Sequence, residues 1–297
     1  MLTIVLASAG CGNESTSSLD DQTTEPKERI PFTLTEANNI SIAAILDDKH
    51  PIRVMLHTAV SSASITTETI NRFSLPFEQT ATVNSWGGEN SARFSSGHSI
   101  HIGNSAWTEL TITESTLSGQ NTDGKIGYNF FHDKIVQFDF ESCSLNLFTS
   151  LPSVDDYETL SIEIEHDLMF IVGSLGEGTE KIENRFLIHS GFGGAVLLDD
   201  QFVTEHRMTE RLNTVGESEL KDSFGNILKT KKVLLPTFAL GGFALQNVPL
   251  LVFEGAIKNQ KFSVIGCDLL KRFHLIIDYQ NRHLYLKPNS LYESEFT

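Results

Sequence analysis

The chain carries the same ten-residue motif twice. The first copy runs from Val54 to Ala63 and reads VMLHTAVSSA, and the second runs from Phe186 to Ala195 and reads FLIHSGFGGA. The copies align without a gap at an offset of 132 residues (189 − 57 = 132). Each has three apolar residues typical of a strand, a histidine, a hydroxyl residue and small residues that allow a tight turn. A repeat of such long period predicts a duplicated unit of structure.

A second block also occurs twice, in the same order along the chain. Ile126–Phe131 (IGYNFF) and Ile265–Leu270 (IGCDLL) place Gly127 and Gly266 at an offset of 139 residues (266 − 127 = 139). An alternating apolar pattern, turn residues and a short Leu-x-Leu segment follow each block, which predicts a hairpin in each copy. A glycine in such a strand marks a sharp turn or the close approach of another backbone. Two copies indicate a duplicated lobe rather than a repeat array.

The composition bounds the fold class and excludes one class of partner. Hydrophobic residues make up 40% of the 297 positions, enough for two compact lobes. The net charge of −16, with no basic cluster, argues against nucleic-acid binding. Runs of Val, Ile, Phe and Thr separated by Gly and Asn predict a mainly β protein. The two best helix candidates are residues 64–73 and 199–212, each just after a histidine motif.

Both repeats together resemble the active-site loops and adjoining glycine strands of bacterial, bilobal aspartic peptidases of the pepsin and retropepsin type. The resemblance covers most of the chain. It implies a mainly β, pepsin/retropepsin-like acid protease fold, with duplicated barrel lobes and a cleft between them. The N-terminal lobe is expected over residues 32–151, the C-terminal lobe over 154–288, and a tail over 289–297.

The chain departs from this family at the catalytic positions. The family has an aspartate where this sequence has His57 and His189, so the resemblance places these two side chains at the catalytic dyad. Thr58 and Ser190 keep the hydroxyl position that supports the two loops in the family. The resemblance also implies that Gly127 and Gly266 are structural residues beside the loops.

The resemblance further implies a flap hairpin over the cleft in each lobe. Residues 83–90 fit the first flap and residues 220–227 fit the second, since both have polar, glycine-containing tips between apolar strands. A peptide or protein segment in the cleft between the lobes is the expected partner. The flap residues expected to bind it are Trp86, Gly87, Gly88, Phe224 and Gly225.

The histidine pair leaves three hypotheses for the chemistry. An aspartic dyad shares one proton, so that one carboxylate acts as base and the other as acid. With His57 and His189 in those places, the cleft either binds a peptide or ligand without hydrolysis, or uses the imidazoles as base and acid near neutral pH. The third hypothesis is a metal held by the two imidazoles; no other cofactor is expected. His98 and His101 are not expected to join that site, because residues three apart in a strand face opposite sides.

A serine or cysteine nucleophile with one of these histidines as its base is a competing hypothesis. Ser61, Ser62 and Ser190 are near the two histidines in the sequence. The chain lacks a Gly-x-Ser-x-Gly nucleophile motif, which weighs against this reading.

The three cysteines have different expected roles. Cys11 ends a short apolar stretch in a segment (residues 1–11) that resembles a bacterial lipobox, in which the cysteine is lipid-modified. Residues 12–31, rich in Ser, Thr, Asp and Glu, are expected to form a disordered tether. The expectation is an envelope protein on the periplasmic face, bound to the membrane through a lipid anchor only. Cys143 and Cys267 are expected to be packing residues, with Cys267 close enough to the cleft for a smaller chance of reactivity.

Overall fold

The structure is a computed structural model that describes residues 25–85, 88–176, 178, 181–253 and 261–297. The protein is mainly β, with 56% of the described residues in strands and 10% in helices. The strands in the described ranges form two large sheets, one with 13 strands and one with 8. The mainly β class predicted from the sequence is therefore confirmed. No described helix has both the length and the apolar character needed to cross a bilayer.

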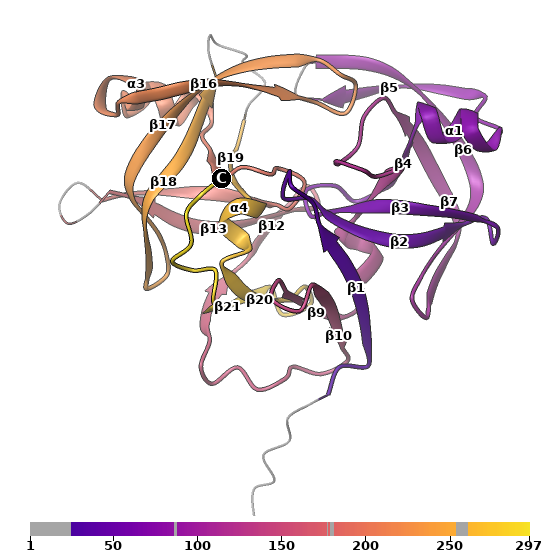
Figure 1. The fold of residues 1–297 in the computed structure, drawn as a ribbon, viewed down its shortest axis with the longest axis horizontal. Helices are drawn as coiled ribbons and strands as arrows, with labels where there is room; N and C mark the ends of the chain where they lie inside the picture. The colour runs from indigo at the N-terminus through magenta and orange to yellow at the C-terminus, as the bar shows by residue number, and fades with distance from the viewer. Residues whose placement is uncertain (1–24, 86–87, 177, 179–180, 254–260) are drawn as a thin grey trace, which may run out of the picture.

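The elements follow one another in a similar order in the two halves of the chain (Figure 1). The N-terminal half contains β1 (Glu28–Leu34), β2 (Ile40–Leu46), β3 (His50–His57), β4 (Ala63–Thr66), α1 (Thr67–Phe73), β5 (Gln79–Ser85), β6 (Gly88–Ile102), β7 (Ser105–Ser115), β8 (Gly124–Gly127), η1 (Tyr128–Phe131), β9 (Ile135–Asp139) and β10 (Ser144–Phe148). The C-terminal half contains β11 (Glu158–Ser161), β12 (Glu163–Glu165), β13 (Leu168–Leu175), β14 (Ile182–His189), β15 (Val196–Leu197), α2 (Asp200–Glu205), α3 (Met208–Arg211), β16 (Thr214–Lys221), β17 (Ile227–Leu240), β18 (Phe243–Phe253), β19 (Ser263–Gly266), α4 (Cys267–Leu270), β20 (Phe273–Asp278) and β21 (His283–Pro288).

The strand pairing of the N-terminal half is repeated in the C-terminal half. Strand β3 pairs in parallel with β8, β8 pairs antiparallel with β4, and β4 pairs in parallel with β7. In the C-terminal half, β14 pairs in parallel with β19, β19 pairs antiparallel with β15, and β15 pairs in parallel with β18. The antiparallel pairs β2–β3, β2–β6, β5–β6 and β6–β7 correspond to β13–β14, β13–β17, β16–β17 and β17–β18. The sequence repeat thus corresponds to a repeated scheme of strand pairing.

Two hairpins join the halves. Strands β9 and β10 form one hairpin, β20 and β21 form the other, and β9 pairs antiparallel with β20. Figure 1 shows this joint sheet below the two sets of repeated strands. Strands β11, β20 and β21 fall in the predicted C-terminal lobe but belong to the 13-stranded sheet. The sheet boundary therefore does not coincide with the predicted lobe boundary near residue 151.

The first strand begins earlier than the sequence predicts. Strand β1 starts at Glu28, inside the stretch predicted as a disordered tether up to residue 31. Ile30 and Phe32 on this strand are buried in the main core. Their burial stabilises residues 28–31 as a strand, although the polar composition around them favours disorder.

The helices are shorter than predicted. The expected helix over residues 64–73 begins at Thr67, because Ala63–Thr66 pairs with β7 and β8 as strand β4. The Thr66 side chain caps the helix by accepting a hydrogen bond from the Thr69 amide. The expected helix over residues 199–212 is two short helices, separated at Arg207, which has a left-handed backbone conformation (φ 49°).

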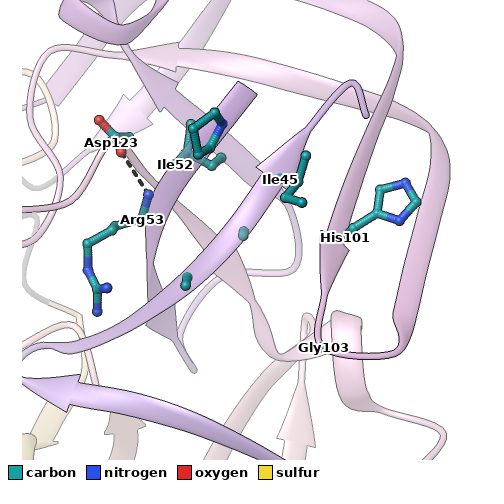
Figure 2. A pocket seen from close by; sticks show the side chains of 9 residues that line it. Ile45, Ile52, Arg53, His101, Gly103 and Asp123 are labelled. Atoms are coloured by element: carbon teal, nitrogen blue, oxygen red, sulfur yellow. Dashed lines mark hydrogen bonds between the residues drawn. The ribbon is translucent and has the colours of Figure 1, made fainter. Parts of the chain in front are cut away.

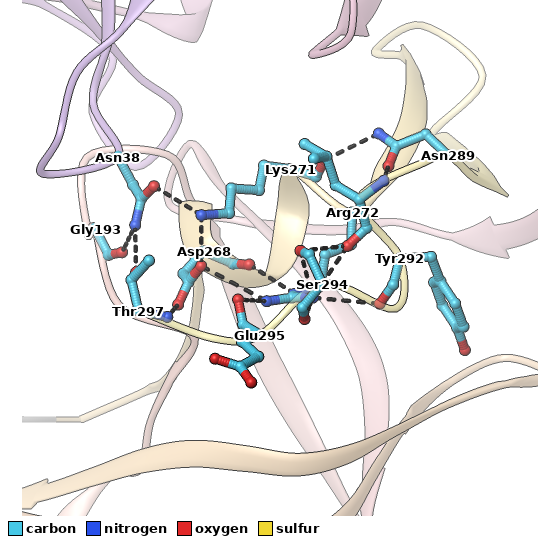
Figure 3. A network of polar contacts seen from close by, with 11 residues as sticks. Asn38, Gly193, Asp268, Lys271, Arg272, Asn289, Tyr292, Ser294, Glu295 and Thr297 are labelled. Carbon is cyan, nitrogen blue, oxygen red and sulfur yellow. Dashed lines mark hydrogen bonds and ion pairs between the residues drawn. The ribbon is translucent and has the colours of Figure 1, made fainter.

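The predicted tail, residues 289–297, is bound to the protein by a buried polar network (Figure 3). The guanidinium of Arg272 is fully buried and donates to main-chain carbonyl oxygens of this segment, which are those of Leu291, Tyr292, Ser294 and Glu295. The Nζ of Lys271 lies 2.8 Å from Asp268 Oδ1 and donates to Asn38 Oδ1 at 3.0 Å. Asn38 donates to the carbonyl of Gly193 at 2.9 Å. The network therefore connects the N-terminal half to the second histidine motif.

Candidate functional site

The two motif histidines lie side by side inside the protein. His57 is the last residue of β3 and His189 is the last residue of β14. Their ring centroids are 4.4 Å apart and the ring planes are inclined by 51°. The residues are only 9% and 8% exposed. Positions separated by 132 residues in the sequence thus meet as one buried pair.

The hydroxyl residues after the histidines hold the two loops together reciprocally. Thr58 Oγ1 donates to the carbonyl of Ile188 at 2.7 Å and accepts from the amide of Ser190 at 2.9 Å. Ser190 Oγ donates to the carbonyl of Leu56 at 2.6 Å and accepts from the amide of Thr58 at 3.0 Å. Both side chains are buried. These four hydrogen bonds relate the two loops by an approximate two-fold symmetry and fix the position of the histidine pair.

The repeated glycines lie directly beneath the histidine loops. Gly127 pairs with His57 and Gly266 pairs with His189 in the parallel strand pairs. A Cβ atom on Gly127 would come within 2.3 Å of the carbonyl oxygen of Val60, and one on Gly266 within 2.1 Å of a loop carbonyl oxygen. Only a residue without a side chain allows this approach.

The two loops differ at the residue after the hydroxyl. The second loop has Gly191, where an added Cβ would lie 2.3 Å from Cδ2 of His57. The first loop has Ala59, which packs against the smaller apolar cluster of the protein. The histidine of the first loop therefore packs against the backbone of the second.

The buried position keeps both imidazoles neutral at pH 7. Burial lowers the pKa of His57 well below its usual value of 6.5, and the nearby His189 and Lys125 lower it further. Burial lowers the pKa of His189 to about 4, Lys125 adds to this effect, and a backbone hydrogen bond opposes it. Within the described part of the chain, Nδ1 of His57 has no hydrogen-bond partner.

Sequence reasoning missed Lys125, a third nitrogen group at this site. It lies on β8 opposite Met55, two residues before the glycine that pairs with His57. Burial lowers the pKa of Lys125 to about 8, while nearby Asp222 acts in the opposite direction. The available signal was the comparison of the two repeats, which places a lysine in Lys-Ile-Gly where the second copy has Val264 in Val-Ile-Gly.

The two segments predicted as flaps lie at the ends of two hairpins, and their described residues are named the two hairpin turns. The first lies where β5 and β6 pair up to Ser85 and Gly88, and the second connects β16 and β17. Gly88 and Gly225 have positive φ angles of 115° and 85°, which glycine adopts readily. Phe224 is half-buried at the second turn. Trp86 and Gly87, the other residues expected to bind a ligand, lie outside the described residues.

The two hairpin turns contact each other, as the approach of β5 and β16 in Figure 1 illustrates. Ser85 Oγ donates to Asp222 Oδ2 at 2.6 Å, and Asn226 Nδ2 donates to Asn90 Oδ1 at 3.3 Å. Lys125 Nζ donates to the hydroxyl of Ser223. The second turn is thus linked both to the first turn and to the lysine beside the histidine pair.

The other histidines considered for a metal site lie elsewhere. Nδ1 of His98 lies 2.9 Å from a carboxylate oxygen of Asp47, and Nε2 of His101 lies 2.7 Å from one of Asp48. His98 is buried and His101 is partly exposed. Among the described residues, the one cluster of three or more groups suited to a metal is Asp139, Glu141 and His274, on the joint sheet.

A shallow pocket of about 510 Å³ lies on the N-terminal half, away from the histidine pair (Figure 2). Its lining includes Ile45, His101 and Asp123. Asp123 accepts a hydrogen bond from the amide of Arg53 at 2.7 Å and forms an ion pair with Arg72 at 2.6 Å. These contacts give Asp123 a structural role at the start of β8.

The described cysteines are free thiols. Cys143 lies in the turn between β9 and β10 with a positive φ of 51°. Cys267 is fully buried, and burial raises the pKa of its thiol to about 12, so it stays protonated and unreactive at neutral pH. Cys11, the predicted lipidation site, lies outside the described residues.

Comparison with known proteins gives no assignment, because no family model and no curated protein matches the chain.

Proposed function

We propose that the chain adopts the two-lobed arrangement of pepsin- and retropepsin-like aspartic peptidases and binds a peptide or other ligand in a cleft between the lobes without hydrolysing it. The observation that carries the proposal is a buried pair of histidine rings that the hydroxyl side chains of both loops hold in place. The rings of His57 and His189 are neighbours at 4.4 Å. The hydroxyls of Thr58 and Ser190 tie the two loops together. These contacts support the proposal that the two imidazoles occupy the positions of the family's catalytic dyad.

The protonation state of the pair favours binding over catalysis. An aspartic dyad works because its two carboxylates share one proton, which supplies a base and an acid together. Two neutral imidazoles have no such proton to share. An imidazole whose pKa is about 4, as for His189, is a weak base at pH 7. Its remaining N–H is a far weaker acid than a carboxylic acid. Water activation and leaving-group protonation both become unfavourable at neutral pH.

The two hairpin turns support the same proposal. The Ser85–Asp222 hydrogen bond links them, and the Ser223 hydroxyl reaches Lys125 beside the pair. A ligand between the two halves would lie under these turns, whose main-chain groups could pair with an extended peptide. The proposed ligand-binding residues are the two turns together with His57 and His189.

The second candidate is a hydrolase that uses the pair as acid and base. It is supported by the 4.4 Å separation of the rings and by Nδ1 of His57, which lacks a hydrogen-bond partner in the described structure. The reaction would need one imidazolium. Because the pKa of His189 is about 4, this state would be populated in acid rather than near neutral pH. Such an enzyme would therefore work best near pH 4.

The third candidate is a metal site. Neutral imidazoles are suitable ligands for zinc or copper. A stable site needs further ligands, and across the described residues neither His57 nor His189 belongs to a cluster of three or more metal-binding groups. We therefore place the metal hypothesis third.

The localisation remains part of the proposal. A lipid-anchored protein of the bacterial envelope would carry acyl chains on Cys11 after cleavage of the preceding segment. The intact mass of the protein purified from membranes tests this directly. An intact mass equal to that of the uncleaved chain without acyl groups would contradict the lipid anchor.

The experiment that tests the proposed function distinguishes binding of intact peptides from their cleavage. Immobilised protein is incubated with blocked, random-sequence dodecapeptides from pH 3.5 to 8.5, and the bound and unbound peptides are analysed by mass spectrometry. The proposal predicts intact peptides retained on the protein, with slower amide exchange at both hairpin turns. The matched control is the His57→Asn/His189→Asn variant. Cleavage that disappears in this variant would replace the proposal with the hydrolase.

A further inference from the structure

A buried lysine stands at one of two equivalent positions beside the histidine pair. Lys125 pairs with Met55, and Val264 pairs with Leu187, so each lies opposite the residue two places before a motif histidine. Val264 is 1% exposed and belongs to an apolar cluster. Lys125 is 9% exposed. The fold accepts an apolar side chain at this position, so packing alone does not explain the lysine.

The ammonium group of Lys125 has spare hydrogen-bonding capacity. It can donate three hydrogen bonds, and among the described residues its partner is the hydroxyl of Ser223. The acidic group that acts electrostatically on it is Asp222. The carboxylate of Asp222 already accepts hydrogen bonds from its own turn and from Ser85. A buried cation that is only partly compensated is costly, which makes it a candidate for ligand binding.

We infer that Lys125 anchors a carboxylate subsite, in which an acidic side chain of a bound peptide pairs with its ammonium group beside His57 and His189. The inference rests on the proposed function, because it specifies the ligand of the same cleft. A charge-assisted hydrogen bond in a buried setting is stronger than one between neutral groups. The subsite would therefore select peptides with Glu or Asp at one position, and the equivalent position at Val264 would select an apolar side chain.

The hydrogen bond from Lys125 to Ser223 links this subsite to the second hairpin turn. Besides the Lys125 contact, the Ser223 carbonyl accepts hydrogen bonds from the amides of Thr116 and Leu117 at 2.8 and 2.9 Å. A carboxylate that reaches the ammonium would share it with the Ser223 hydroxyl or displace that hydroxyl. Either arrangement gives the ammonium group a charged acceptor.

The test uses two pools of blocked dodecapeptides that are random except for one fixed central residue, Glu in one pool and Gln in the other. Retention is measured on the 297-residue protein at pH 6.5. We expect Glu peptides to be retained about ten- to hundredfold more tightly than Gln peptides, since a hydrogen bond to a charged group contributes that much. Lys125→Met should abolish the preference while Gln peptides still bind, and Lys125→Arg should keep it.

A second variant separates ligand binding from a merely structural role. Ser223→Ala removes the same hairpin contact but leaves the ammonium, so it should retain the preference for Glu. If Ser223→Ala loses the preference as completely as Lys125→Met does, Lys125 only positions the hairpin and the inference is wrong. Equal binding of both pools to the unaltered protein also overturns it, but leaves the proposed function standing. Binding of neither pool overturns both. Thermal unfolding verifies that every variant is folded.

The pH dependence supplies an independent readout. The titratable groups acting on this site are His57, His189, Asp222 and Lys125 itself. Both imidazoles are neutral from pH 6.5 upward, and the lysine loses its charge above a pKa of about 8. The preference for Glu should therefore be present at pH 6.5 and lost at about pH 9.5. A preference that persists unchanged at the higher pH would contradict the assignment.

Discussion

The reciprocal hydrogen bonds of Thr58 and Ser190 make a strong prediction about stability. Replacing Thr58 with Val keeps the shape of the side chain but removes its hydroxyl. The carbonyl of Ile188 and the amide of Ser190 then lose a buried partner. Leaving a buried polar group unsatisfied costs about 1–3 kcal/mol, so two such groups cost about 2–6 kcal/mol.

The assay is thermal unfolding with a matched control. A loss of this size should lower the melting temperature of a chain this long by at least about 3 °C. Thr58→Ser retains the hydroxyl and should melt well above Thr58→Val. Adding Ser190→Ala to Thr58→Val should cost less than the sum of the two single changes, because each hydroxyl bonds to the loop that carries the other.

Two results would contradict a stabilising role for the Thr58 hydroxyl. Thr58→Val could melt within about 1 °C of the unaltered protein, which would mean that the hydroxyl contributes little. Alternatively, Thr58→Ser could be as unstable as Thr58→Val, which would assign the effect to the lost methyl group. Either result would remove the argument that these hydroxyls fix the position of the histidine pair.

Three further predictions concern the histidine pair and the C-terminal segment. Gly191→Ala places a methyl group about 2.3 Å from Cδ2 of His57, so the ring must move and its NMR signals must shift; unchanged signals would contradict the packing. The pKa of His189 is about 4 when folded and 6.5 when unfolded, so acidification protonates the unfolded chain first and lowers stability. Between pH 7 and pH 4 the unaltered protein should therefore lose about 3 kcal/mol more than His189→Gln in urea unfolding, and equal losses would contradict the lowered pKa. Arg272→Met removes the buried donor to the carbonyl groups of residues 291–295, so limited proteolysis should cut this segment much faster, and an unchanged cleavage rate would refute its role.

The repeats made much of the frame predictable from the sequence. The constant offset between the two motifs predicted that His57 and His189 occupy equivalent positions. In the structure, the pairing of β3 with β8 is repeated by the pairing of β14 with β19. Glycine in an otherwise apolar strand marked the close backbone approach at Gly127. These features are local patterns that recur, so a single sequence is sufficient to recognise them.

The remaining features depend on contacts that a sequence does not state. The hairpin contact between Ser85 and Asp222 joins residues 137 positions apart that no shared motif connects. The charge state of the pair depends on burial, which a linear pattern cannot quantify. The only sequence signal for Lys125 is its difference from Val264 at the equivalent position of the second repeat, and that difference does not reveal that the lysine is buried. Strand β1 began early because its apolar residues bury against distant strands.

The most direct test of the central claim is the protonation state of His57 and His189. Long-range ¹H–¹⁵N NMR of the ten histidines, followed from pH 3 to 8, reports the charge of each ring. His57→Gln and His189→Gln variants assign the two signals. We expect both rings to be neutral at pH 7 and His189 to become charged only near pH 4. An imidazolium on either ring at pH 6 to 7 would contradict it, because the pair would then have a proton to share and could serve as acid and base.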